Sequence, residues 1–60
     1  LYSQIGNTKK VLIENSNNKI SFGKDQHFNR VCINEKLKSG EIFNCDVYDV
    51  NQNILQSTKI

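Results

Sequence analysis

The sequence predicts an all-β domain folded as a small five-stranded closed barrel. Three observations support this prediction: short apolar runs alternate with polar residues, clusters rich in asparagine or glycine separate these runs, and the chain contains no proline. Closing five short strands into a barrel removes the exposed edges that an open sheet would present. A chain of 60 residues is long enough for one such domain.

The first strand is expected near the N-terminus. Tyr2 and Ile5 are expected to pack onto the domain or to end a preceding helix of a longer protein, before a turn at residues 6–7. Residues 9–14 (KKVLIE) are expected to form the strand, with Val11 and Ile13 on its inner face. Four polar turn-forming residues follow at 15–18 and predict a hairpin.

The second strand is expected over residues 19–22, where polar and apolar residues alternate. This alternation predicts that Ile20 and Phe22 enter the core and that Lys19 and Ser21 face solvent. Gly23 is expected to break the strand, and a loop should then run to about residue 29.

The third strand is expected over residues 30–33, with Val31 and Ile33 inward and Cys32 on the other face. Residues 34–40 (NEKLKSG) are polar with one leucine and could form a helical turn. Leu37 is expected to cover one end of the core.

Residues 41–48 give the clearest strand signal, with Phe43, Cys45 and Val47 facing the core and Tyr48 facing solvent. Residues 51–53 (NQN) predict a second hairpin turn. Residues 54–60 are expected to form the last strand.

In this last strand the neighbours Ile54 and Leu55 compete for the core position, and the pattern leaves the choice open. The core barrel is therefore expected over about residues 9–60. The predicted architecture is the oligonucleotide-binding (OB) type of barrel.

The net charge of +2 permits binding of a polyanion, although dedicated nucleic-acid-binding proteins are usually more basic. No apolar run is long enough to span a bilayer, and no charged segment followed by an apolar one suggests a leader, so we expect a cytoplasmic protein without a membrane partner. Because the chain begins at Leu1 and contains no methionine, we expect it to be a piece of a longer protein.

The residues that could carry chemistry are few. Cys32 and Cys45 accompany a single histidine, whereas a zinc site needs about four ligands, so no metal site is expected. A disulfide is possible by counting, but the predicted faces of the two cysteines differ, which favours reduced thiols. Asp46 and Asp49 are expected to point to opposite faces, and no catalytic residue is assigned.

Three short motifs follow one another along the chain, and their order and spacing are informative. Residues 5–14 contain IG and then KVLIE, residues 23–31 are GKDQHFNRV, and residues 40–47 are GEIFNCDV, with Leu55 near the end. In this order and spacing they resemble the TRAM domain, a small RNA-binding barrel appended to tRNA- and rRNA-modifying enzymes.

Three positions differ from the pattern of that family. Asp25 stands where threonine is usual and would oppose a phosphate, His27 stands where asparagine is frequent, and Ser57 replaces a closing glycine.

The VLIE motif and the GxxxxF loop are most similar to the C-terminal domain of radical-SAM tRNA methylthiotransferases. This resemblance implies a parent enzyme that adds sulfur and a methyl group to an adenosine next to the anticodon, using 4Fe–4S clusters and S-adenosylmethionine. No cofactor is expected in this segment itself, which has none of the cluster cysteines. The RNA uracil-5-methyltransferases are an alternative parent.

The expected partners are tRNA or another structured RNA and the catalytic domain of the parent, with no DNA. Phe28 is expected either to plug the barrel or to stack on a base, which is worth about 1–3 kcal/mol. Lys36 and Lys38 could extend a group of basic residues.

A competing hypothesis is a protein-interaction module that docks onto its own catalytic domain. The candidate RNA-binding residues are Lys9, Lys10, Lys19, Lys24, His27, Phe28, Arg30 and Tyr48.

Overall fold

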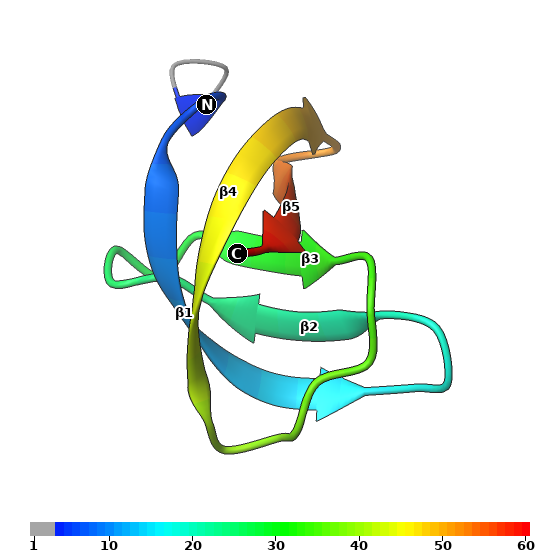
Figure 1. Ribbon diagram of the computed structural model, residues 1–60. Coiled ribbons are helices and arrows are strands. Elements are labelled where there is room, and N and C mark those ends of the chain that lie inside the picture. The colour runs from blue at the N-terminus through cyan, green and yellow to red at the C-terminus, as the bar shows by residue number, and fades with distance from the viewer. Residues whose placement is uncertain (1–3) are drawn as a thin grey trace.

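A computed structural model describes residues 4–60, which form five strands closed into a barrel (Figure 1). The order around the barrel is β1-β2-β3-β5-β4, and all neighbouring pairs are antiparallel except β3 and β5, which are parallel. The predicted all-β, OB-like fold class is confirmed. The strands are β1 (Thr8–Ser16), β2 (Ser21–Lys24), β3 (Arg30–Ile33), β4 (Ile42–Asn51) and β5 (Ile54–Lys59).

The long strand β1 closes the barrel because it belongs to two pairings. Its first half pairs with β4 and its second half with β2, and Leu12 takes part in both. A bulge between Ile13 and Asn15 accompanies this change of partner and lets the strand bend. The outer surfaces of β4, β1, β2 and β3 are therefore continuous.

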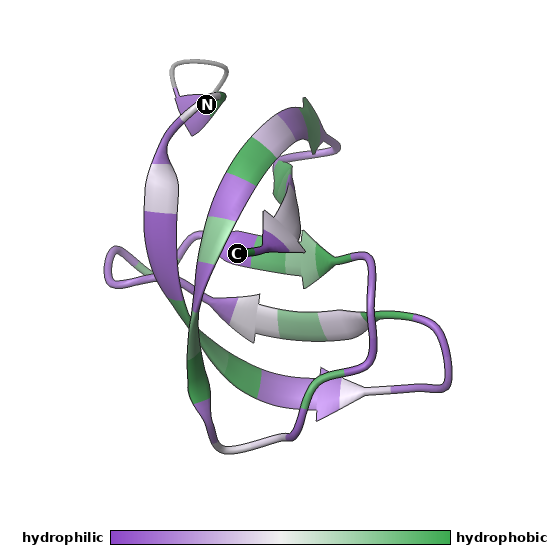
Figure 2. Ribbon diagram, viewed as in Figure 1, coloured by the Kyte–Doolittle hydropathy of each residue, from purple (hydrophilic) through white to green (hydrophobic). Residues whose placement is uncertain are grey.

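The core is made of the inward residues of all five strands, and the alternation along β4 is visible as changes of colour in Figure 2. Leu55 is fully buried and Ile54 is half-buried, which decides the position that the sequence left open. Leu37 is also buried, as predicted. The buried apolar residues are Val11, Ile13, Val31, Ile33, Leu37, Cys45, Val47, Val50 and Leu55.

The predicted faces of β2 are wrong. Ser21 is fully buried, whereas Phe22 is 40% exposed and Ile20 is half-buried. Ser21 can lie inside because its hydroxyl donates to the Glu35 carbonyl and accepts from the Leu37 amide, both at 2.7 Å. These two hydrogen bonds satisfy the buried hydroxyl, which a pattern of apolar residues cannot reveal.

Gly23 does not break β2, contrary to the prediction. It lies within the strand, paired with Ile13 on one side and Val31 on the other. Its missing side chain lets the Leu12 carbonyl approach, because a Cβ built there would overlap the Leu12 carbonyl oxygen. The strand therefore continues to Lys24.

Two further predictions are corrected. Within the described residues, 34–40 form bends and a turn at residues 39–40 instead of a helical turn. Asp46 and Asp49 are both exposed, because a bulge between Val47 and Asp49 shifts the alternation by one residue. Asp46 accepts a hydrogen bond from Thr8 at 2.7 Å.

Both predicted hairpins are present. Asn17 stabilises the β1–β2 turn because its side-chain oxygen accepts from the amides of Lys19 and Ile20 at 2.8 and 2.9 Å. Gln52 and Asn53 form the β4–β5 turn with φ of 52° and 63°, the conformation of a type I′ turn.

The N-terminal prediction concerns Tyr2, which lies outside the described residues, and Ile5, which is 41% exposed. Across residues 4–60, no helix is long and apolar enough to pass through a bilayer.

Candidate nucleic-acid interface

Four outward side chains lie in one register line across four strands. Ile42 of β4 pairs with Leu12 of β1, Leu12 pairs with Lys24 of β2, and Lys24 pairs with Arg30 of β3. With about 4.8 Å between neighbouring strands, this cross-strand row extends for about 14 Å. Its apolar half is exposed (Ile42 65%, Leu12 44%), and the cationic half is exposed as well.

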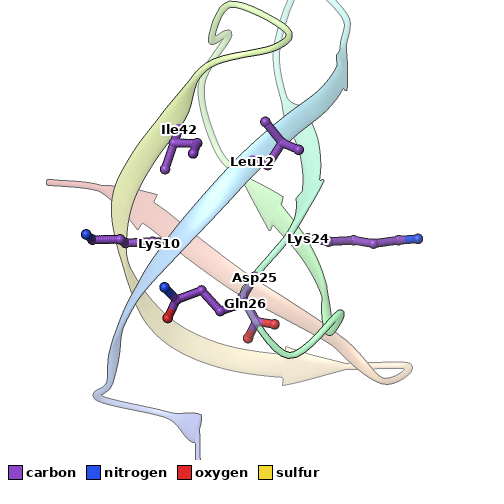
Figure 3. Close-up of a pocket in the computed structure, with 6 residues that line it drawn as sticks. All are labelled: Lys10, Leu12, Lys24, Asp25, Gln26 and Ile42. Carbon is purple, nitrogen blue, oxygen red and sulfur yellow. The ribbon is translucent and has the colours of Figure 1, made fainter.

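Two hollows meet at Lys24, the third member of the row. The first has a volume of about 150 Å³ and lies where β1, β4 and the β2–β3 loop come together (Figure 3). The second, of about 220 Å³, lies over β1, β2 and β3 and includes Phe22 and Arg30. The first hollow is lined by Lys10, Leu12, Lys24, Asp25, Gln26 and Ile42, and the second by Glu14, Phe22, Gly23, Lys24, Arg30, Val31 and Ile54.

The β2–β3 loop is held together by the carboxylate of Asp25, which is only 6% exposed. Its Oδ1 accepts from the amides of His27 and Asn29 at 2.8 and 2.9 Å, and its Oδ2 accepts from the Asn29 side-chain amide at 3.0 Å. Backbone hydrogen bonds from Asp25 N to Asn29 O and from Phe28 N to Asp25 O close the same turn. The loop is therefore fixed before any ligand binds.

These contacts determine the charge of Asp25. Burial by itself raises the pKa of the carboxyl, but hydrogen bonds from Asn29 and His27, together with the positive charge of Lys9, outweigh it. The pKa of Asp25 consequently lies below its ordinary value, and the side chain is ionised at neutral pH. Asp25, which the sequence analysis expected to oppose a phosphate, is thus a structural residue whose carboxylate holds the loop together.

Phe28 is not a plug for the barrel, because 81% of it is exposed. Its backbone has a φ of 63°, a left-handed conformation that bulky residues rarely adopt. The loop thus presents an aromatic ring to solvent two residues before Arg30 in the hairpin that joins Lys24 to Arg30.

The structure brings some of the predicted residues together. Lys24 and Arg30 form the cationic half of the cross-strand row, and Lys10 lines the first hollow beside it. His27 and Phe28 lie in the adjoining loop, where both are exposed.

Other predicted residues lie elsewhere. Lys9 is half-buried on the inward face of β1, and its positive charge helps to lower the pKa of Asp25. Lys19 lies in the β1–β2 turn, at the other end of β2 from the β2–β3 loop (Figure 1). Tyr48 is 53% exposed toward the far end of β4 from Ile42.

Lys36 and Lys38 do not extend the cationic half of the row. They lie on the crossover from β3 to β4, whose Leu37 is bonded to Ser21 at the start of β2. Lys38 also lies 3.8 Å from Glu41 as an exposed ion pair.

Sequence reasoning missed four surface residues that line the row or the two hollows: Leu12, Phe22, Gln26 and Ile42. Leu12 and Ile42 carried a usable signal, because each is an apolar residue at an outward position of an alternating strand. Phe22 was assigned to the core, and an isolated glutamine in a loop gives no signal at all.

The two cysteines are free thiols, Cys45 buried and Cys32 half-buried. Burial raises the pKa of both, and for Cys45 the negative charges of Asp46 and Glu35 raise it further. Their thiolates are therefore disfavoured, so neither is activated as a nucleophile. Among residues 4–60 no three His, Cys, Asp or Glu side chains are grouped so as to hold a metal ion.

No family model matches the chain, and no curated protein matches it.

Proposed function

We propose that this barrel is an RNA-binding accessory domain that helps a modifying enzyme hold its tRNA. The observation that carries the proposal is the cross-strand row, in which exposed apolar residues continue into Lys24 and Arg30, together with the exposed Phe28 two residues before Arg30. OB-type barrels bind oligonucleotides through the face of their second and third strands, which is the face that carries this cationic pair.

The chemistry of the surface suits a single-stranded segment of RNA. Lys24 and Arg30 would contact phosphates, which positions RNA without reading its sequence, and Phe28 would stack on a base. With three or four phosphates neutralised, the slope of log K against log salt is about −2 to −3. Such binding is weak alone and becomes effective when the domain is tethered to a catalytic partner.

The parent enzyme belongs to the same proposal. The TRAM-like motifs suggest a cytoplasmic radical-SAM tRNA methylthiotransferase, with an RNA uracil-5-methyltransferase as the alternative. The 4Fe–4S clusters and S-adenosylmethionine of a methylthiotransferase would then be held by another domain. The two cysteines of this chain lie on different sides of the barrel wall, one in the core and one half-buried.

A salt series tests the proposal directly. Fluorescence anisotropy of labelled tRNA titrated with the 60-residue chain should show binding that weakens roughly 20- to 50-fold between about 50 and 200 mM salt. Absence of salt-sensitive binding at low ionic strength and high protein concentration would rule the proposal out.

Charge reversal locates the binding face. The double variant Lys24→Glu and Arg30→Glu should abolish tRNA binding at about 50 mM salt, because two phosphate contacts are replaced by repulsion. The matched control, Lys36→Glu with Lys38→Glu, has the same net charge but alters the crossover, so it should retain most of the affinity. Circular dichroism of both variants confirms folding. Equal losses in the two variants would mean that only net charge matters.

The docking hypothesis also has a specific observation in its favour. Leu12 and Ile42 form an exposed apolar pair on adjacent strands, a feature typical of protein contacts as well as of base contacts. Unchanged tRNA affinity in the Lys24→Glu, Arg30→Glu variant would favour docking onto a catalytic domain.

A further inference from the structure

The first hollow differs in chemistry from the cationic surface beside it. Its floor is the cross-strand pair Leu12 and Ile42, which lie directly opposite each other in register. Residues so paired have Cβ atoms about 5 Å apart, so the two side chains make a continuous apolar surface. In Figure 3 Lys10 and Lys24 extend to opposite sides, with Leu12 and Ile42 above them and Asp25 and Gln26 below.

The wall of the hollow comes from the β2–β3 loop, through Asp25 and Gln26. The Asp25 oxygens accept hydrogen bonds from His27 and Asn29 and are thus turned to their own loop. Its negative charge, kept at neutral pH, opposes a phosphate in this hollow but tolerates a neutral group. The flanking lysines can hold phosphates on either side.

Gln26 supplies the polar group at this wall. The Asp25 carboxylate bonds the amides of His27 and Asn29, which follow Gln26, so the backbone that carries the glutamine is fixed. A glutamine amide offers one acceptor and two donors, and it pairs bidentately with the N6 and N7 atoms of adenine. A ligand with flat apolar faces and a polar edge matches this combination.

We propose that the hollow between β1, β4 and the β2–β3 loop is a subsite for one unstacked nucleobase, with Leu12 and Ile42 against its face and Gln26 on its edge, and that this subsite prefers adenine. The inference rests on the proposed RNA-binding function and adds base discrimination to a surface whose other contacts are to phosphates. Unpaired bases are the form in which sequence is usually read in RNA.

The test compares three single-stranded RNA hexamers at about 50 mM salt: hexauridine, and hexauridine with one central uridine replaced by adenosine or by cytidine. The wild-type chain should bind the adenosine hexamer about five-fold more tightly than the other two, the lower end expected for a bidentate contact. Gln26→Ala should reduce this ratio to about one while affinity for hexauridine stays within about two-fold.

Gln26→Glu provides a second readout, because a carboxylate accepts from the N4 amino group of cytosine. The ratio of affinities for the adenosine and cytidine hexamers should then shift toward cytidine, and this ratio cancels the general effect of the added charge. Gln52→Ala, on the β4–β5 turn, is the matched control and should leave the wild-type ratio unchanged.

The outcomes separate the two proposals. Equal wild-type affinities for all three hexamers, or an adenosine preference that persists in Gln26→Ala, would overturn the base subsite while leaving RNA binding intact. No binding of any hexamer or of tRNA would overturn both.

Discussion

Phe28 combines two unfavourable features in a single residue. Its ring is 81% exposed, and its backbone adopts a left-handed conformation that costs an L-residue about 1–2 kcal/mol. Neither feature helps the fold, and strained backbone conformations cluster at sites that bind ligands.

Replacing Phe28 with alanine separates binding from stability. We expect Phe28→Ala to weaken RNA binding by about 1–3 kcal/mol, the value of one base stacked on an aromatic ring. The thermal midpoint should change little, because the ring is not part of the core. Tyr48→Ala is the control: it also removes an exposed aromatic ring, toward the far end of β4, and should leave affinity unchanged. Equal losses in both variants would contradict the role of Phe28.

Asp25 supports the same loop through its ionised form. Asp25→Ala should lower the free energy of unfolding at pH 7 by about 1–3 kcal/mol, because three hydrogen bonds are lost and their donors are left in a part-buried site. Asp25→Asn should cost less, since its remaining oxygen can still accept from the two backbone amides.

The pH dependence follows from the lowered pKa of Asp25. A carboxyl whose pKa is lower in the folded than in the unfolded state stabilises the fold fully above the unfolded value, here 3.8. This stabilisation is lost as the pH falls through the folded value. Urea titrations of wild type and Asp25→Asn should therefore differ at pH 7, and the difference should begin to shrink once the pH falls below the unfolded value of 3.8. A difference that stays constant as the pH is lowered from 7 through this range would show that the charge of Asp25 does not contribute to it.

At the scale of the elements, β1 and β2 approach each other closely where β1 changes partner. Gly23 pairs with Ile13 next to the bulge, and the Leu12 carbonyl occupies the space that a side chain at residue 23 would need. This contact fixes the register in which Lys24 meets Leu12. The cross-strand row depends on it.

Gly23→Ala should consequently destabilise the domain by about 3 kcal/mol or more. The new Cβ would overlap the backbone carbonyl of Leu12, which cannot rotate out of the way as a flexible side chain could. Gly40→Ala is the comparison: it has open space around it and a φ of 88°, so only the backbone conformation is strained, at about 1–2 kcal/mol. Equilibrium unfolding in urea measures both. A Gly23→Ala barrel as stable as wild type would contradict the close approach.

At the scale of the whole molecule, stability depends on a small core. A domain of 60 residues buries little surface, and its total stability is expected near the lower end of the range of about 5–15 kcal/mol. Leu55 lies at the centre of this core, paired with Val31 of β3 and Val50 of β4. It therefore joins the two strands that flank β5.

Leu55→Ala should cost about 2–5 kcal/mol and leave much of the protein unfolded. Its neighbour Ile54 is half-buried and points away from the core, so Ile54→Ala should cost clearly less. Thermal melts followed by circular dichroism compare the two. The reverse order of stabilities would mean that the inward residue of β5 had been assigned wrongly.

The sequence by itself determined the class of the fold, both hairpin turns and most of the inward faces. Val11, Ile13, Val31, Ile33, Cys45 and Val47 were predicted correctly because alternation along one strand is a local property. The sequence also placed Lys24, Phe28 and Arg30 in or beside the loop between the second and third strands, but it left open whether Phe28 plugs the barrel or faces solvent.

Only the tertiary structure decided which residues of different strands meet. Ser21 is buried because the crossover from β3 to β4 returns to bond its hydroxyl, a contact made by residues 14 and 16 positions away. Ile42 lies beside Leu12 because β1 bends and exchanges β4 for β2. Register between strands distant in sequence is set by such bulges and crossovers, and local alternation contains no information about them.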